Sequence, residues 1–135
     1  TSFKAFTPGN SMDSLFGWGV LVGIVDSGID FTLDDFRNED GSTRIQALWD
    51  QSLDAQGEDR MPEPYGRDVE YTMEEINRAF EMEDDIDAQQ DGNIESRRNI
   101  RTMDISGHGT AVAGIAAGSG ENYRGVAPES ELIVV

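Results

Sequence analysis

The sequence has 135 residues, enough for one ordinary domain and too few for two. Its 10 basic and 27 acidic residues give a net charge of −17, which argues against nucleic-acid partners and against attachment to anionic membranes. It has no cysteine, which excludes disulfides and thiol nucleophiles, and no run of about 20 apolar residues that could span a membrane.

The first apolar segment, residues 20–25, reads VLVGIV and predicts a strand that is buried on both faces. It ends at Asp26, and Gly28 allows a sharp turn two residues later. In open α/β sheets, sites form at the carboxyl ends of such strands. Asp26 is therefore a candidate site residue, although taken alone it could equally be a carboxylate that caps the turn.

Residues 51–104 form a long polar stretch, which we interpret as an acidic insertion over the surface. One helix is predicted inside it, near residues 72–82. Thr72 and Glu75 have the spacing of a capping box. An apolar stripe along the same helix is formed by Met73, Ile76 and Phe80.

The last part of the chain returns to small and apolar residues. His108, the single histidine, lies between two glycines at the start of a predicted helix that ends near Gly118. The helix dipole should help to keep its ring neutral, although alone it could be a polar residue at an exposed helix start. Residues 132–135 predict another buried strand. The order strand, helix, strand favours an α/β fold with an open parallel sheet, and because the chain stops in an apolar strand we expect a fragment.

Two segments, VDSGID at 25–30 and GHGTAVAG at 107–114, resemble the first two active-site motifs of the subtilase family. They occur in the family's order, Asp before His before Ser. The segment GVAP at 125–128, which leads to the last strand, is also similar to the family. The resemblance covers about residues 17–50 and 103–135. It implies a subtilisin-like α/β fold, with an open parallel sheet and helices on both faces, of which residues 1–135 are the N-terminal portion.

The resemblance also implies roles. His108 would be the general base and Asp26 would orient its ring. The nucleophilic Ser and the oxyanion Asn are expected beyond Val135, and neither Ser106 nor Ser119 matches the nucleophile's position. The expected function is a serine endopeptidase that acts on a protein or peptide substrate, with the rest of the catalytic domain as its partner. The alternative is a non-catalytic homologue, with a binding or regulatory role, that has lost the Ser.

The chain departs from compact subtilases in the 82 residues that separate Asp26 from His108. The segments around Trp49 and Tyr71 resemble clostridial subtilases, including the Csp-type proteases of spore germination. A secreted or spore-associated bacterial protein is therefore expected.

We expect no cofactor, and calcium is the one candidate that the resemblance raises. Asp35 matches the family's calcium Asp, but the loop at 118–123 is short. Residues 87–98 approximate a calcium-binding EF-hand loop, in which Arg98 replaces the required Glu.

Overall fold

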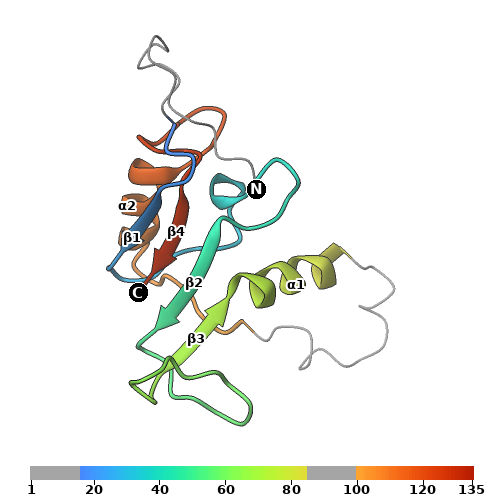
Figure 1. Cartoon of the computed structure of the whole chain (residues 1–135), viewed down its shortest axis with the longest axis vertical. Helices are drawn as coiled ribbons and strands as arrows, with labels where there is room; N and C mark the ends of the chain where they lie inside the picture. Colours follow the sequence, from blue (N-terminus) through green and yellow to red (C-terminus); the bar gives the residue numbers. More distant parts are fainter. Residues whose placement is uncertain (1–15, 85–99) are drawn as a thin grey trace.

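The computed structural model describes residues 16–84 and 100–135, which form a four-stranded sheet with two helices (Figure 1). The strand order is β1 (Leu21–Ile24), β4 (Glu131–Val134), β2 (Ile45–Asp50) and β3 (Val69–Thr72). The first three strands are parallel, and β3 pairs with β2 in the antiparallel sense at one edge. The α/β fold class with a mostly parallel sheet is thus confirmed.

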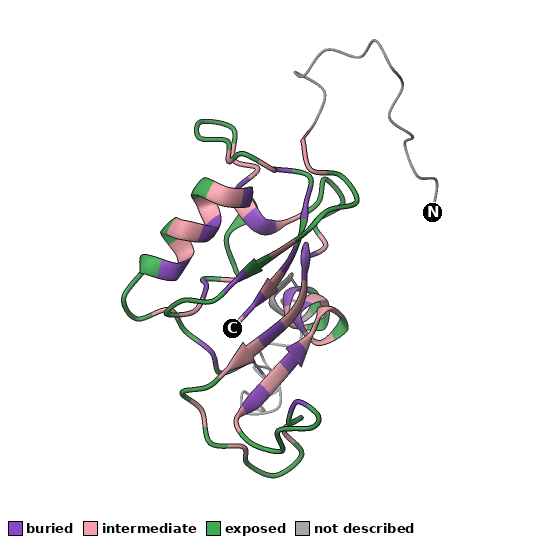
Figure 2. Ribbon diagram, turned by 60° about the vertical axis from the view of Figure 1, so that its left-hand side comes forward, coloured by how far each residue is buried: buried purple, intermediate pink, exposed green. Residues whose placement is uncertain are grey.

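One face of the sheet carries the core. Leu132 and Val134 of β4 are fully buried, as is Leu48 of β2, which is paired with Val134. Residues that alternate with them are more open, and Leu21 of β1 is 52% exposed. Figure 2 shows the buried residues concentrated on the strands and on the helix surfaces that face them. The expectation that residues 20–25 are buried on both faces is therefore wrong for the part of the chain that the structure describes.

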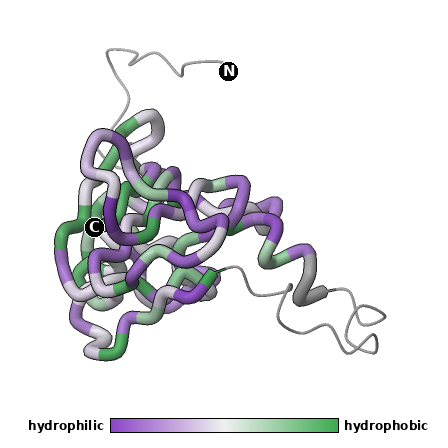
Figure 3. Tube along the Cα trace, turned by 90° about the horizontal axis from the view of Figure 1, so that it is seen from below, coloured by the Kyte–Doolittle hydropathy of each residue, from purple (hydrophilic) through white to green (hydrophobic). Residues whose placement is uncertain are grey.

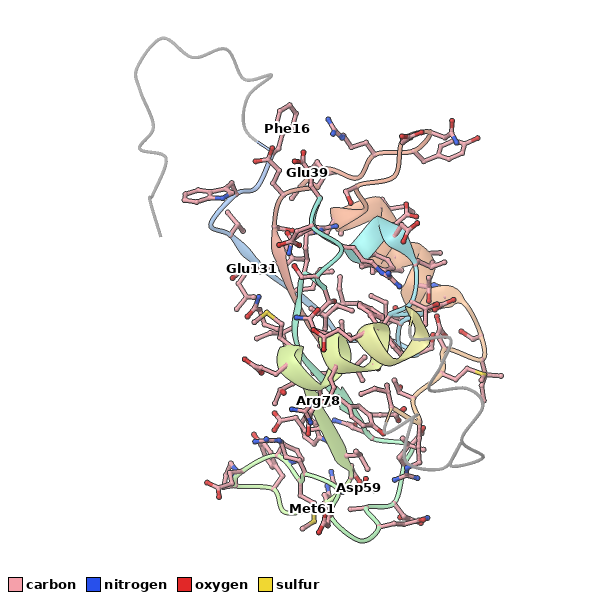
Figure 4. All side chains as sticks on the ribbon, turned by 90° about the vertical axis from the view of Figure 1, so that its right-hand side faces the viewer. Phe16, Glu39, Asp59, Met61, Arg78 and Glu131 are labelled. Atoms are coloured by element: carbon pink, nitrogen blue, oxygen red, sulfur yellow. The ribbon has the colours of Figure 1, made fainter. Side chains whose placement is uncertain are left out.

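Both helices pack on the core-bearing face. Helix α2 (His108–Ala117) lies against β1 and buries Ala113 and Ala117 completely. Helix α1 (Met73–Asp84) lies against β2 and β3 and adds Ile76 and Phe80 to the same core. In Figure 4, β1 is on the left of the ribbon and α2 on the right. No layer among the described residues covers the second face, which explains the exposure of β1.

The polar stretch contributes more ordered structure than its composition suggests. The capping box is present, because the Thr72 N–H donates to Glu75 Oε2 at 2.8 Å and the Glu75 N–H donates to Thr72 Oγ1 at 3.4 Å. The preceding strand β3 was not anticipated; it buries Val69 and Tyr71, and the Tyr71 hydroxyl accepts a hydrogen bond from the Arg101 N–H. In the hydropathy colouring of Figure 3, hydrophilic segments are spread over much of the described chain.

The carboxyl end of α2 is fixed by hydrogen bonds to all four of its last carbonyl groups. Such carbonyls have no partner inside a helix. Backbone N–H groups reach three of them, and the buried guanidinium of Arg44 donates to the fourth, on Ala117. The three N–H donors belong to Gly118, Val126 and Ala127. The helix that begins at His108 is therefore anchored at its far end, as predicted for a helix that ends near Gly118.

Candidate active site

Asp26 lies two residues after the end of β1, at the carboxyl end of the parallel strands. Its N–H donates to the Val135 carbonyl at 3.0 Å, which extends the pairing of β1 with β4 by one step. Its Oδ1 accepts the N–H of Ser27 at 2.8 Å. Gly28 then turns the chain with a φ of +117°, which a residue with a side chain rarely adopts. The carboxylate is held by its own turn and points out of the sheet end.

His108 is the first residue of α2, after Gly107 with a φ of +71°. Its Nδ1 lies 2.7 Å from Asp26 Oδ1, within the range expected for a hydrogen bond between the two sequence candidates. The His108 side chain is 71% exposed and the Asp26 side chain 20% exposed. The fold therefore brings the two residues together across 82 positions of sequence and leaves the imidazole open to a reacting group.

Each member of the pair changes the pKa of the other. The hydrogen bond with His108, followed by that from the Ser27 N–H, lowers the pKa of Asp26. The same hydrogen bond and the carboxylate charge raise the pKa of His108 above 6.5. The helix dipole was expected to favour the neutral ring, whereas the hydrogen bond and charge of Asp26 give a net rise in the pKa of His108. Because an ionised carboxylate only accepts, the neutral ring keeps its proton on Nδ1 and has Nε2 as its acceptor.

Gly109 allows α2 to contact the turn after β1 directly. A Cβ at this position would lie 2.2 Å from the Gly28 carbonyl oxygen and 3.2 Å from Asp26 Cβ. The first distance is shorter than real Cβ contacts and the second is a tight one, so the backbone of the helix abuts the Asp26 turn with no room for a methyl group. The glycine after His108 is a requirement of this approach.

Asp104 is a polar residue of the site that the sequence analysis missed. Its carboxylate accepts four hydrogen bonds, from the Ser27 hydroxyl, the Gly107 N–H, and both the N–H and the hydroxyl of Thr110. Partial burial works to raise the pKa of Asp104, but the hydrogen bonds from Thr110, Ser27 and Gly107 outweigh it and hold that pKa far below its usual value. An acidic residue four positions before the first residue of the helix is the sequence signal that could have indicated it.

The other serines near the motifs have structural partners. Ser106 Oγ donates to Ser27 Oγ at 2.8 Å and accepts the His108 N–H at 3.0 Å. Ser119 lies beyond the opposite end of α2, where its hydroxyl contacts the Asp35 carbonyl. Neither arrangement presents a hydroxyl to the His108 ring.

The residues that could be related to a calcium site have other roles or lie outside the described residues. Asp35 contributes its backbone carbonyl to Ser119 and Arg44. Among residues 16–84 and 100–135, no three His, Cys, Asp or Glu side chains are grouped so that they could hold a metal ion. The EF-hand-like segment 87–98 lies outside the described residues.

A cleft of about 370 Å³ opens beside Asp26. It is formed at the carboxyl ends of the parallel strands, and its lining residues include Trp49 and Asp50, the last two residues of β2, and Val135, which follows β4. In the part of the chain with described structure, no helix is long and apolar enough to cross a membrane. The carboxyl ends of the parallel strands thus form an open cleft that Asp26 helps to line.

The comparisons with known proteins agree with this arrangement. The model of the subtilase family matches residues 17–135. No curated protein matches the sequence significantly. Among solved structures, the CspB protease of Clostridium perfringens is similar, with a TM-score of 0.64 and 33% sequence identity over 90% of this chain. The match spans 21% of the length of that protein. From the family match and the structural likeness together, we conclude that the chain belongs to the subtilase family.

Proposed function

We propose that this chain supplies two members of the catalytic triad of a serine endopeptidase. The observation that carries the proposal is the 2.7 Å contact between His108 Nδ1 and Asp26 Oδ1, in a chain of the subtilase family. The nucleophilic serine is proposed to come from the part of the protein that follows Val135. The similarity to a protease of known structure supports a peptidase role for the complete protein.

In the proposed reaction, His108 Nε2 accepts the proton of the serine hydroxyl while the serine oxygen attacks the scissile carbonyl carbon. When the tetrahedral intermediate collapses, the C–N bond breaks and His108 returns the proton to the leaving amine. Asp26 accepts the Nδ1–H throughout, which fixes the tautomer and stabilises the imidazolium. The raised pKa of His108 supports this role, since it reflects the stabilisation of the protonated ring by Asp26.

The remainder of the catalytic domain is proposed to pack on the open face of the sheet. Leu21 of β1 is 52% exposed, and Val25, which follows β1, is 81% exposed. Covering apolar side chains of this kind is favourable by roughly 25 cal/mol per Å² removed from water. The complete protein is also proposed to bring its serine within reach of the exposed His108 side chain.

The experiment uses the complete protein and a serine-directed fluorophosphonate probe. The wild type should be labelled, His108→Ala should lose most of the labelling, and Asp26→Asn should lower turnover by up to about 10⁴-fold because the ring adopts the wrong tautomer. Ser119→Ala is the matched control and should keep both the labelling by the probe and the turnover of the wild type. A folded wild type that is never labelled would identify the non-catalytic alternative. Normal turnover in Asp26→Asn would remove Asp26 from the mechanism.

A further inference from the structure

Asp104 joins two parts of the chain that each carry one member of the pair. Its Oδ1 accepts the Ser27 hydroxyl at 2.8 Å and the Gly107 N–H at 3.0 Å. Its Oδ2 accepts the Thr110 N–H at 2.9 Å and the Thr110 hydroxyl at 2.6 Å. Ser27 follows Asp26 in the turn after β1, and Gly107 and Thr110 flank His108 in α2. One carboxylate therefore contacts both sides of the site.

The first turn of α2 depends on this network for its N–H groups, which have no partner inside the helix. Gly107 provides no side-chain cap. The Thr110 N–H is taken by Asp104, the Gly109 N–H by Ser27 Oγ at 3.0 Å, and the His108 N–H by Ser106 Oγ. Since the Ser106 hydroxyl donates to Ser27 and the Ser27 hydroxyl donates to Asp104, the three acceptors form one chain of hydrogen bonds that ends on this carboxylate.

A second link runs through Thr110. Its Oγ1 donates to Asp104 and accepts the N–H of Asp30 at 2.9 Å. Because Asp104 takes the hydroxyl proton, the oxygen of Thr110 is turned so that it can accept from the loop after β1. Asp104 thus orients both hydroxyl groups, those of Ser27 and Thr110, through which α2 is tied to the loop that carries Asp26.

We propose that Asp104 is a positioning residue, which fastens the first turn of α2 to the turn after β1 and thereby sets the contact between His108 and Asp26. The effect on catalysis rests on the proposed function, whereas the effect on the geometry of the pair does not. Asp104 has no contact with the His108 ring among the hydrogen bonds of the described residues, so it acts through Ser27, Gly107 and Thr110.

The test must separate position from charge, because ionised Asp104 also adds, after Asp26, to the rise in the pKa of His108. Asp104→Asn removes the charge and one of the two acceptor oxygens. Ser27→Ala removes the bridging hydroxyl and changes no charge. Asp34→Asn is the charge control, since the Asp34 side chain is 96% exposed on the short helix η2 (Asp34–Phe36). All variants are made in the complete protein, and its folding is checked by circular dichroism.

The first readout is the NMR titration of the His108 ring, whose signal is identified by its absence in His108→Gln. Asp104→Asn and Ser27→Ala should each shift the titration midpoint downward, because each loosens the hydrogen bond to Asp26. The double variant should shift it by less than the sum, as expected for residues in one network. Asp34→Asn should leave the midpoint in place.

The second readout is steady-state kinetics on a peptide substrate. Asp104→Asn and Ser27→Ala should each lower kcat by roughly 10- to 100-fold, which is the cost of a small misplacement of catalytic groups, and KM should change much less. If Ser27→Ala leaves the His108 midpoint unchanged, Asp104 acts through its charge alone and the proposal is overturned. If Asp104→Asn fails to fold, Ser27→Ala decides by itself. If the wild type has no activity, the proposed function fails, while the titration still decides the role of Asp104.

Discussion

Gly109 is the residue at which the backbone of α2 comes nearest to the turn after β1. In Gly109→Ala the new Cβ would meet the Gly28 carbonyl oxygen at 2.2 Å, so the helix start must move away from Asp26. We expect a loss of stability of about 1–3 kcal/mol, as is usual for overpacking, and a fall in the pKa of His108 as its hydrogen bond lengthens. Urea unfolding and NMR titration measure the two effects.

The matched control for this prediction lies in the same helix. A Cβ added at Gly114 would meet no atom of another element within 4 Å, so Gly114→Ala should gain roughly 0.5–1 kcal/mol from helix propensity. The pair of variants changes the same residue type in the same element. Equal effects at the two positions would show that the close approach at Gly109 is not what fixes the site.

Residues of the site differ in how far the sequence could predict them. Asp26 and His108 stand in motifs whose residues and order are specific to one family, so their proximity could be predicted across 82 positions of sequence. Asp104 could be noticed as an acidic residue before the helix start, but its link to the Asp26 turn could not be predicted, because Ser27 is 77 positions away and is reached only after the chain has folded. The net direction of the His108 pKa shift was not predicted, because it is set mainly by the hydrogen bond and the charge of the Asp26 carboxylate at 2.7 Å.

Among the elements, those with a strong local signal were predicted correctly. The capping box and apolar stripe located α1, and the run of small residues between glycines located α2. Strand β3 was missed because its buried residues, Val69 and Tyr71, lie in a polar region and become a strand only by pairing with β2. The burial of residues 20–25 on both faces was wrong because both described helices pack on one face of the sheet.

Arg44 is the tertiary contact that fixes the carboxyl end of α2. Its guanidinium is 4% exposed and donates to the carbonyl groups of Asp35, Ala117 and Ser130. A cation is also favourable at the negative end of the helix dipole. Arg44→Met would keep most of the volume and leave three carbonyl groups without this donor. The Asp35 carbonyl keeps the Ser119 N–H as a donor, so two buried carbonyl groups are left unsatisfied. At about 1–3 kcal/mol for each, we expect a loss of at least about 2 kcal/mol in the free energy of unfolding.

Chemical unfolding of Arg44→Met and of Arg78→Met tests this expectation. Arg78 is exposed on α1 (Figure 4), so the same substitution there should change stability by no more than about 0.5 kcal/mol. A loss at position 44 that is no larger than the loss at position 78 would contradict the role assigned to Arg44. The difference between the two variants isolates the buried contacts from the removal of one positive charge.

At the scale of the whole molecule, the charge distribution opposes a compact structure. The chain carries 27 acidic against 10 basic residues, and a large net charge destabilises a compact state through self-repulsion. The few ion pairs among the described residues are mostly at the surface, such as Arg67 with Asp68, where each contributes little. The core must therefore hold together against a repulsion that acts over the full surface.

Salt should accordingly stabilise the protein. Raising the ionic strength from about 10 mM to about 150 mM shortens the Debye length from roughly 30 Å to roughly 8 Å, which screens the repulsion between distant carboxylates. We expect the urea midpoint to rise over this range, since urea itself is uncharged.

Two exposed positions provide a matched pair: Glu58→Lys gives a net charge of −15 and Arg78→Glu gives −19, in place of −17. At low salt the first should be more stable than the wild type and the second less stable, and the differences should shrink at about 150 mM. A midpoint that falls with salt would mean that local ion pairs, and not the net charge, dominate the electrostatic free energy of folding.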